Sequence, residues 1–180
     1  MILSDREILK ELRKGNIVIK PFKRSALGSN SYDVHISKHL SVYKDKILDS
    51  KKDNNVRQIL IPEKGLVLKP GELYLGSTLE YTESHKHVPF LDGKSSIGRL
   101  GIDIHATAGR GDIGFCNHWT LELSVTRPVR IYPGMPIGQL IYFKVKGKIL
   151  VPYNKKKGAK YTKKDILPQE SKMFKNFKKD

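Results

Sequence analysis

The sequence contains a long series of short apolar segments separated by turn-forming residues, and this pattern limits the folds open to the chain. Tyr32, Val34 and Ile36 alternate with Asp33 and His35, as in a strand with one buried face. Sequences rich in glycine and proline stand between such segments, and this spacing is typical of a β-sandwich or barrel. The strands that we expect cover residues 17–19, 32–36, 40–43, 56–61, 66–68, 73–79, 102–105, 119–125, 129–132 and 138–145.

The N-terminus is the one place where the pattern favours a helix. Ser4 and Glu7 have the spacing of a capping box, and Gly15 stands where a helix would end. With 180 residues, the chain is long enough for one domain with a sizeable core. We therefore expect a mainly β fold with a short N-terminal helix, in which residues 1–150 form the barrel and residues 151–180 form a lysine-rich segment of the same domain.

Composition excludes several classes of protein. No apolar run approaches the roughly 20 residues of a membrane helix. Asp5 stands where a secretory signal would carry basic residues, so we expect a cytoplasmic protein. Cys116 is the only cysteine, which excludes an intramolecular disulfide and a thiolate-rich zinc site. His85 and His87 lie two residues apart in an expected loop without an acid-rich partner set, so no metal site is predicted there.

The formal net charge of +16 first suggests a nucleic-acid partner. The excess is concentrated, because residues 151–180 hold ten lysines against three acids, a net charge of +7. Such a segment can bind a polyanion, close over a nucleotide triphosphate, or form a solvated surface. A single-strand-binding barrel would interleave exposed aromatic and basic residues, whereas here the aromatics lie mostly in apolar runs such as Ile141-Tyr142-Phe143.

Residues 92–101 combine two cations, two hydroxyls and several glycines. Glycine lets backbone amides approach a phosphate, and Lys94 and Arg99 supply positive charge. This composition indicates an anion-binding surface. The alternative is a helix capped by Ser95 or Ser96, with Arg99 exposed one turn later.

Two acidic residues stand out further along the chain. Glu122 lies between Leu121 and Leu123 in an expected strand, so its side chain points to the opposite face. A carboxylate in a dry cleft can take up a proton and return it, whereas one on an open face is merely solvated. Asp112 lies in a glycine-rich turn, where it can accept a hydrogen bond from a sugar hydroxyl or simply form the turn.

Linked motifs along nearly the whole chain resemble the dCTP deaminases of the trimeric dUTPase superfamily. Residues 44–55 are the least diagnostic part. The matching motifs are Met1-Ile2-Leu3-Ser4-Asp5, Ser31-Tyr32-Asp33-Val34, Pro70-Gly71-Glu72, Gly93-Lys94-Ser95-Ser96-Ile97-Gly98-Arg99-Leu100-Gly101, His105-Ala106-Thr107-Ala108-Gly109, Gly114-Phe115, Thr120-Leu121-Glu122, Pro133-Gly134-Met135, Ile137-Gly138-Gln139-Leu140, Pro152-Tyr153-Asn154 and Ala159-Lys160-Tyr161.

The resemblance implies a distorted jelly-roll barrel that assembles as a homotrimer with active sites at subunit boundaries. It implies hydrolytic deamination of dCTP without catalytic zinc, with Glu122 as general base and then acid, and with Ser95 and Arg99 holding water and stabilising charge. The expected substrate contacts are Lys94, Ser95, Ser96, Ile97, Gly98 and Arg99, Asp112 on the deoxyribose, Thr120, Leu121 and Glu122 on the base, and Tyr153, Lys160 and Lys164 from the tail. Mg²⁺ is expected with the triphosphate.

Two departures from the family pattern matter. Gly111-Asp112-Ile113-Gly114 replaces Ile-Asp-Pro-Gly or Ile-Asp-Ala-Gly, and the loss of the bulky residue and the proline predicts a looser loop. Lys164 stands where the family pattern has a glutamine, whose amide both donates and accepts hydrogen bonds. His105 is expected to be structural or to form a hydrogen bond near the site.

Three other functions remain open on the sequence. A bifunctional enzyme would also hydrolyse dUTP to dUMP; Gly109 resembles that subgroup, whereas Arg110 resembles the strictly deaminating one. A plain dUTPase would not need Arg99 and Glu122, and would usually carry a tyrosine near Phe115. A non-catalytic barrel that binds nucleic acid is the third alternative, from another class.

Overall fold

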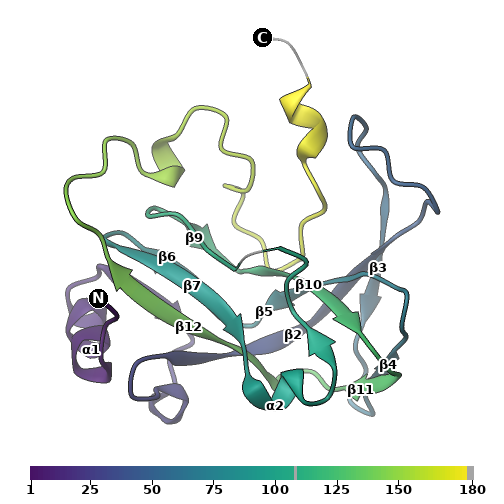
Figure 1. The fold of residues 1–180 in the computed structure, drawn as a ribbon, viewed down its shortest axis with the longest axis horizontal. Helices are drawn as coiled ribbons and strands as arrows, with labels where there is room; N and C mark the ends of the chain where they lie inside the picture. Colours follow the sequence, from purple (N-terminus) through teal and green to yellow (C-terminus); the bar gives the residue numbers. More distant parts are fainter. Residues whose placement is uncertain (108, 178–180) are drawn as a thin grey trace.

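Strands form most of the molecule, shown in Figure 1. The computed structural model describes residues 1–107 and 109–177; Ala108 of the matched motif and Lys178 and Lys179 of the tail lie outside these residues. The helices and strands are α1 (Asp5–Arg13), β1 (Ile17–Lys20), β2 (Tyr32–Tyr43), β3 (Val56–Leu60), β4 (Leu66–Leu68), β5 (Tyr74–Thr78), β6 (Tyr81–Ser84), β7 (His87–Gly93), α2 (Ser95–Gly98), β8 (Ile102–Asp103), β9 (Cys116–Asn117), β10 (Thr120–Val125), β11 (Val129–Ile131) and β12 (Pro136–Lys144).

The strands curl into a barrel-like arrangement around one apolar core. The largest sheet has the order β7-β12-β2-β5-β10-β8, with β3 added to β2, and smaller sheets join β1-β6-β9 and β11-β4. The core contains the inward-facing side chains of neighbouring strands, including Tyr32, Leu121 and Leu140, which are fully buried. The predicted mainly β barrel with a short N-terminal helix is confirmed. None of the helices in the described residues is long and apolar enough to cross a membrane.

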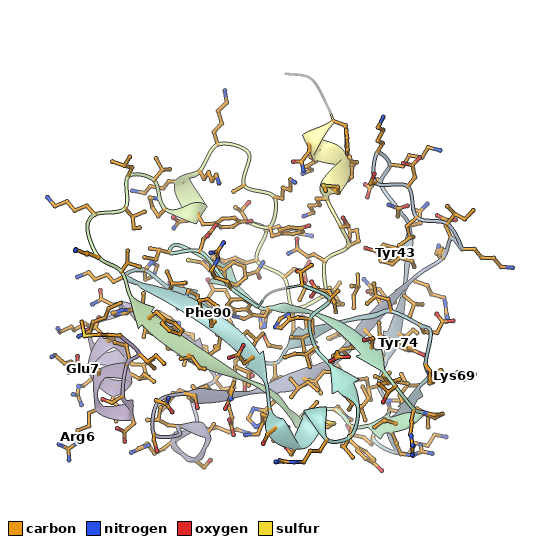
Figure 2. All side chains as sticks on the ribbon, in the orientation of Figure 1. Arg6, Glu7, Tyr43, Lys69, Tyr74 and Phe90 are labelled. Carbon is orange, nitrogen blue, oxygen red and sulfur yellow. The ribbon has the colours of Figure 1, made fainter. Side chains whose placement is uncertain are left out.

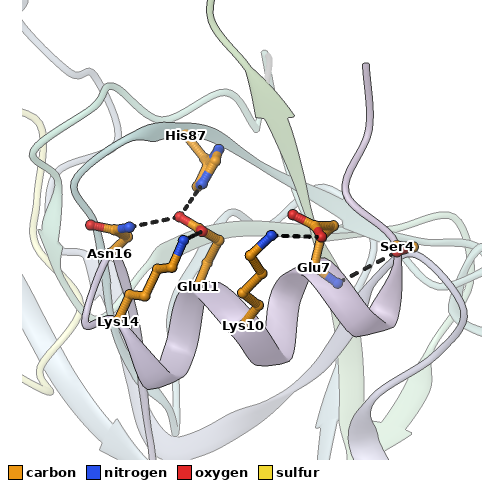
Figure 3. A network of polar contacts seen from close by, with 7 residues as sticks. All are labelled: Ser4, Glu7, Lys10, Glu11, Lys14, Asn16 and His87. Carbon is orange, nitrogen blue, oxygen red and sulfur yellow. Dashed lines mark hydrogen bonds and ion pairs between the residues drawn. The ribbon is translucent and has the colours of Figure 1, made fainter.

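The N-terminal helix α1 has the predicted ends. The amide of Glu7 donates to the Ser4 hydroxyl at 3.5 Å, and Gly15 follows the helix with a φ of +69°. Near the C-terminal end of α1, Glu11 lies only 8% exposed and accepts from His87 of β7 at 2.9 Å and from Asn16 at 2.7 Å. Figure 3 shows this network, which ties the helix to the start of β7.

Strands β6, β7 and β9 were not predicted. The Asp92-Gly93 pair is typical of a turn in the sequence, but these two residues end β7 and pair with Gln139 and Gly138 of β12. Because β7 contains Pro89 and several polar residues, the sequence pattern did not predict a strand here. A proline is compatible with this position because β7 is the terminal strand of the sheet order, where one side of the backbone needs no strand partner.

The C-terminal segment from residue 145 onward contains two short 3₁₀ turns, Tyr153–Lys155 and Met173–Asn176. In Figure 1 this green-to-yellow segment passes over the side of the barrel where β9 and β10 lie. Tyr43 of β2 lies on the same side in Figure 2, and its hydroxyl accepts from the amide of Ser171 at 3.0 Å. The segment is therefore packed onto the barrel.

Candidate active site

Glu122 lies at the centre of strand β10 and faces a cavity of about 520 Å³. Its neighbours Leu121 and Leu123 are fully buried, so the predicted alternation is confirmed. The side chain of Glu122 is 36% exposed, so in this chain the carboxylate lies between the two alternatives of a dry cleft and an open, solvated face. Phe115 and Trp119 form an apolar wall of this cavity and pack against each other with ring centroids 4.8 Å apart.

The His105 side chain contacts the Glu122 carboxylate. Its Nδ1 atom lies 3.4 Å from Oε2 of Glu122, and its Nε2 atom lies 2.8 Å from the carbonyl oxygen of Leu91. A carbonyl oxygen only accepts, so Nε2 carries a proton and the ring is held in one orientation. The structure thus places His105 within the site, beyond the purely structural role that the sequence also allowed.

The edge of β10 beside Glu122 is open at its start. Strand β8 pairs with β10 only at Ser124 and Val125, and no other strand in the described part of the chain pairs with this edge at Thr120 or Leu121. The Leu121 side chain is fully buried, so only its backbone can contact a ligand. The hydroxyl of Thr120 accepts from the amide of Gln169 at 3.1 Å.

The predicted anion-binding residues lie on helix α2, away from this cavity. Lys94 is the N-cap residue of α2, so the alternative cap by Ser95 or Ser96 is wrong, although a helix does begin here. Ser95, Ser96, Gly98 and Arg99 are exposed, whereas the Ile97 side chain is only 4% exposed and packs in the core. Lys94 forms an ion pair with Asp33.

Within this chain, therefore, Arg99 and Glu122 are not brought together. None of the α2 residues lines the cavity around Glu122. In Figure 1, α2 lies at the lower edge of the barrel and the C-terminal segment at the upper one.

Asp112 lines a neighbouring cavity of about 540 Å³ together with Tyr153, Lys156 and Lys157. Burial raises the pKa of the Tyr153 hydroxyl, which therefore stays protonated and can donate a hydrogen bond. This cavity combines an acceptor for a hydroxyl with two cations, as a sugar phosphate requires.

The loop that carries Asp112 packs closely against its surroundings at two glycines. The Gly111 amide donates to the Pro89 carbonyl at 2.8 Å, and a Cβ at Gly111 would lie 2.5 Å from the Trp119 ring. Gly114 has a φ of +90°, and a Cβ there would lie 2.9 Å from the amide nitrogen of Tyr153. Gly111 thus allows close packing against Trp119, and Gly114 allows close packing against the tail at Tyr153.

Residues that were not predicted as part of the site hold the tail at the Glu122 cavity. The side chain of Asn117 donates to the Lys163 carbonyl at 2.7 Å and accepts from the Asp165 amide at 3.0 Å. Tyr161 and Gln169 line the cavity itself. Asn117 lies between the Gly114-Phe115 and Thr120-Leu121-Glu122 motifs, and only the folded structure shows that its partners lie more than 40 residues away.

Two predicted tail contacts lie elsewhere. Lys160 is half-buried, and its carbonyl accepts from the Lys172 amine at 3.1 Å. Lys164 lies 3.7 Å from a Glu83 oxygen and 5.2 Å above the Tyr81 ring, in a separate cavity. In this arrangement the Lys164 amine interacts with protein groups.

Comparisons with known proteins place these features in a family. The family model described as "dCTP deaminase-like" matches residues 2–145. A protein of Cytophaga hutchinsonii named "dCTP deaminase, dUMP-forming" is 48% identical over 180 residues, covering 99% of this chain and all of the relative. A protein of Clostridium acetobutylicum with the same name is 48% identical over 178 residues, covering 98% of this chain and 99% of the relative.

Among solved structures, a 2'-deoxycytidine 5'-triphosphate deaminase from Agrobacterium tumefaciens matches with a TM-score of 0.62 at 17% identity. The match covers 78% of this chain but only 47% of that longer chain, and it supports the fold alone. The family model and the full-length relatives carry the assignment further. This chain belongs to the dCTP deaminase-like family.

Proposed function

We propose that this protein hydrolyses dCTP to dUMP in two steps. Water first replaces the amino group at C4 of cytosine, giving dUTP and ammonia, and a second water then releases diphosphate and leaves dUMP. The observation that carries the proposal is the Glu122 carboxylate beside His105 in a cavity on a chain of this family. Full-length relatives named as dUMP-forming support this reading over the release of dUTP as the end product.

Glu122 is the proposed proton shuttle of the first step. Its carboxylate takes a proton from the attacking water and delivers it to N3 of the base, and a second transfer lets the amino group leave as ammonia. A base held against the open backbone edge at Thr120 and Leu121 would place its ring close to Glu122. Phe115 and Trp119 provide the apolar surface beside it.

His105 is a positioning residue for Glu122 in this mechanism. Because Nε2 donates to the Leu91 carbonyl, Nδ1 of the neutral ring has no proton to give. The contact between Nδ1 and Glu122 becomes a hydrogen bond only when the pair holds one extra proton. That is the state of the site after Glu122 has accepted a proton from water, so His105 stabilises the loaded shuttle.

Ser95 and Arg99 are proposed to act from a neighbouring copy of the chain. Both side chains are exposed on α2 and lie outside the cavity of their own Glu122. A homotrimer in which α2 of one protomer meets the Glu122 cavity of the next would supply a hydroxyl for the water and a guanidinium for the developing charge. It would also exclude water from the partly exposed carboxylate.

The triphosphate is proposed to bind Lys94, Ser95 and Ser96, with Tyr153 closing from the tail and Asp112 holding the deoxyribose. Mg²⁺ fits as a companion of the nucleotide, since phosphate oxygens and water satisfy it without a full protein cage. Within the described residues, one group of three potential metal ligands is found, and it includes a thiol, which does not suit Mg²⁺.

The mechanism is tested with Glu122→Gln and the matched control Glu63→Gln, whose side chain is exposed on another face. We expect Glu122→Gln to fold and to bind dCTP while ammonia release falls by about 10³-fold or more. Glu63→Gln should release ammonia as the wild type does. Ammonia release near the wild-type rate by Glu122→Gln would contradict the role of Glu122.

A further inference from the structure

Three side chains with metal-binding atoms meet in a third cavity, of about 270 Å³, which Lys164 of the tail also lines. Glu83, His85 and Cys116 each line it, and their carboxylate oxygen, imidazole nitrogen and sulfur atoms all lie within 4.8 Å of one another. Glu83 and Cys116 are partly buried, and His85 is exposed, so the group is open to ions from solvent.

The fold builds this cluster through strand pairing. Glu83 of β6 and Cys116 of β9 are direct cross-strand partners, and such partners project their side chains to the same face. His85 follows Glu83 by two residues, and its Nε2 atom lies 2.7 Å from Oε2 of Glu83. Strand β9 was not predicted, so the sequence did not show that Cys116 lies beside Glu83 and His85.

We propose that Glu83, His85 and Cys116 form a binding site for one zinc ion. The ligands are Oε2 of Glu83, Nε2 of His85 and Sγ of Cys116, with water in the fourth position. A set of one nitrogen, one sulfur and one oxygen suits a borderline cation such as Zn²⁺, and three protein ligands with an open position are a recurrent zinc geometry. A single thiolate suffices here, so the exclusion of thiolate-rich sites does not apply.

The proton balance of binding is simple. The Cys116 thiol now donates to the Gly114 carbonyl at 3.4 Å, and His85 and Glu83 share one proton between Nε2 and Oε2. When Nε2 and Oε2 coordinate Zn²⁺, the shared proton passes through solvent to Nδ1 of His85, which keeps the ring neutral. The Cys116 thiol releases its own proton to solvent. No oxidation or reduction is involved.

The groups around Glu83 show how a cation would be accommodated. The Tyr81 hydroxyl donates to Oε1 of Glu83 at 2.6 Å, which leaves Oε2 for the metal and fixes the carboxylate. The Lys164 amine lies 3.7 Å from the same Oε1 and would be repelled by Zn²⁺. Because Lys164 belongs to the tail, zinc binding would release one contact of the segment that is packed onto the barrel.

None of the three proposed zinc ligands lines the Glu122 cavity, although Tyr161 lines both cavities. Cys116 and Asn117 are neighbours on β9, and their side chains point to opposite faces, so that Asn117 lines the Glu122 cavity and Cys116 lines the other. Zinc binding can therefore be measured without reference to turnover, and its failure would leave the proposed function untouched.

The test uses the full-length, untagged protein with excess Mg²⁺, so that oxygen-preferring sites are occupied. Co²⁺ is titrated first, because a cobalt–thiolate bond gives a charge-transfer absorption that oxygen and nitrogen ligands do not. We expect this absorption with one equivalent of Co²⁺, and we expect Zn²⁺ to remove it by competition.

Two variants define the ligands. Cys116→Ser should abolish the charge-transfer absorption, and Cys116→Ser and His85→Gln should each weaken Zn²⁺ binding about ten-fold or more, whereas the control His39→Gln should bind as the wild type does. Circular dichroism checks that each variant is folded. A wild-type protein without the thiolate absorption, or ligand variants that bind Zn²⁺ as tightly as the wild type, would overturn the proposal.

Discussion

The Nδ1 atom of His105 lies 3.4 Å from the Glu122 carboxylate, while Nε2 of the same ring is fixed by the Leu91 carbonyl. We predict that His105→Asn lowers kcat for deamination by about 10- to 100-fold with little change in KM, because the protonated Glu122 loses a partner that forms only during the reaction. Steady-state kinetics of ammonia release measure both constants. A change in KM alone would assign His105 to substrate binding instead.

The proposed homotrimer, in which Arg99 and Glu122 of one active site come from different protomers, can be tested with mixed assemblies. Arg99→Ala and Glu122→Gln should each be inactive alone. Mixing them after denaturation and refolding should restore about a quarter of the wild-type activity, since a random trimer then contains sites with both native residues. If the mixture stays as inactive as its components while gel filtration shows trimers, Arg99 and Glu122 act within one chain.

The tail contact at Asn117 predicts an effect on substrate affinity. Asn117→Ala removes the hydrogen bonds to the Lys163 carbonyl and the Asp165 amide. We expect KM for dCTP to rise about ten-fold, because each substrate molecule must then order a looser segment. Limited trypsin digestion should cleave this variant faster in the lysine-rich tail. An unchanged KM together with rapid cleavage would show that the tail does not take part in binding.

The network of Figure 3 predicts acid sensitivity of the fold. Burial alone would raise the pKa of Glu11, but hydrogen bonds from His87 and Asn16, with the nearby charges of His87 and Lys14, lower it from 4.5 to about 2. A lowered pKa in the folded state means that the ionised carboxylate stabilises the fold above pH 4.5. This stabilisation is lost as the pH falls from 4.5 towards 2.

Urea unfolding measures this contribution. At neutral pH, Glu11→Gln should lower the free energy of unfolding by up to about 3 kcal/mol, and the difference from the wild type should shrink between pH 4.5 and 2. The exposed pair of Glu7 with Lys10 provides a control, because Glu7→Gln should change stability by less than about 1 kcal/mol. A difference between Glu11→Gln and the wild type that is independent of pH would contradict the assignment.

The barrel could be predicted from the sequence because apolar and polar residues alternate in strands with one buried face, as in β2 and β10. Strand β7 was not predicted because it contains Pro89 and Asp92. Proline and aspartate are rare in central strands, although an edge strand accepts them. Glu122 and its direction followed from its neighbours Leu121 and Leu123. The surroundings of Glu122 could not be predicted in this way. Contacts such as those of Asn117 with residues 163 and 165 depend on how distant segments of the chain pack.

The proposed end product, dUMP, can be distinguished from dUTP in a single incubation. The wild-type protein is incubated with dCTP and Mg²⁺, and ammonia, diphosphate, dUTP and dUMP are quantified over time. We predict that ammonia and diphosphate appear in equal amounts, that dUMP accumulates and that dUTP does not. Accumulation of dUTP with ammonia but without diphosphate would contradict the claim.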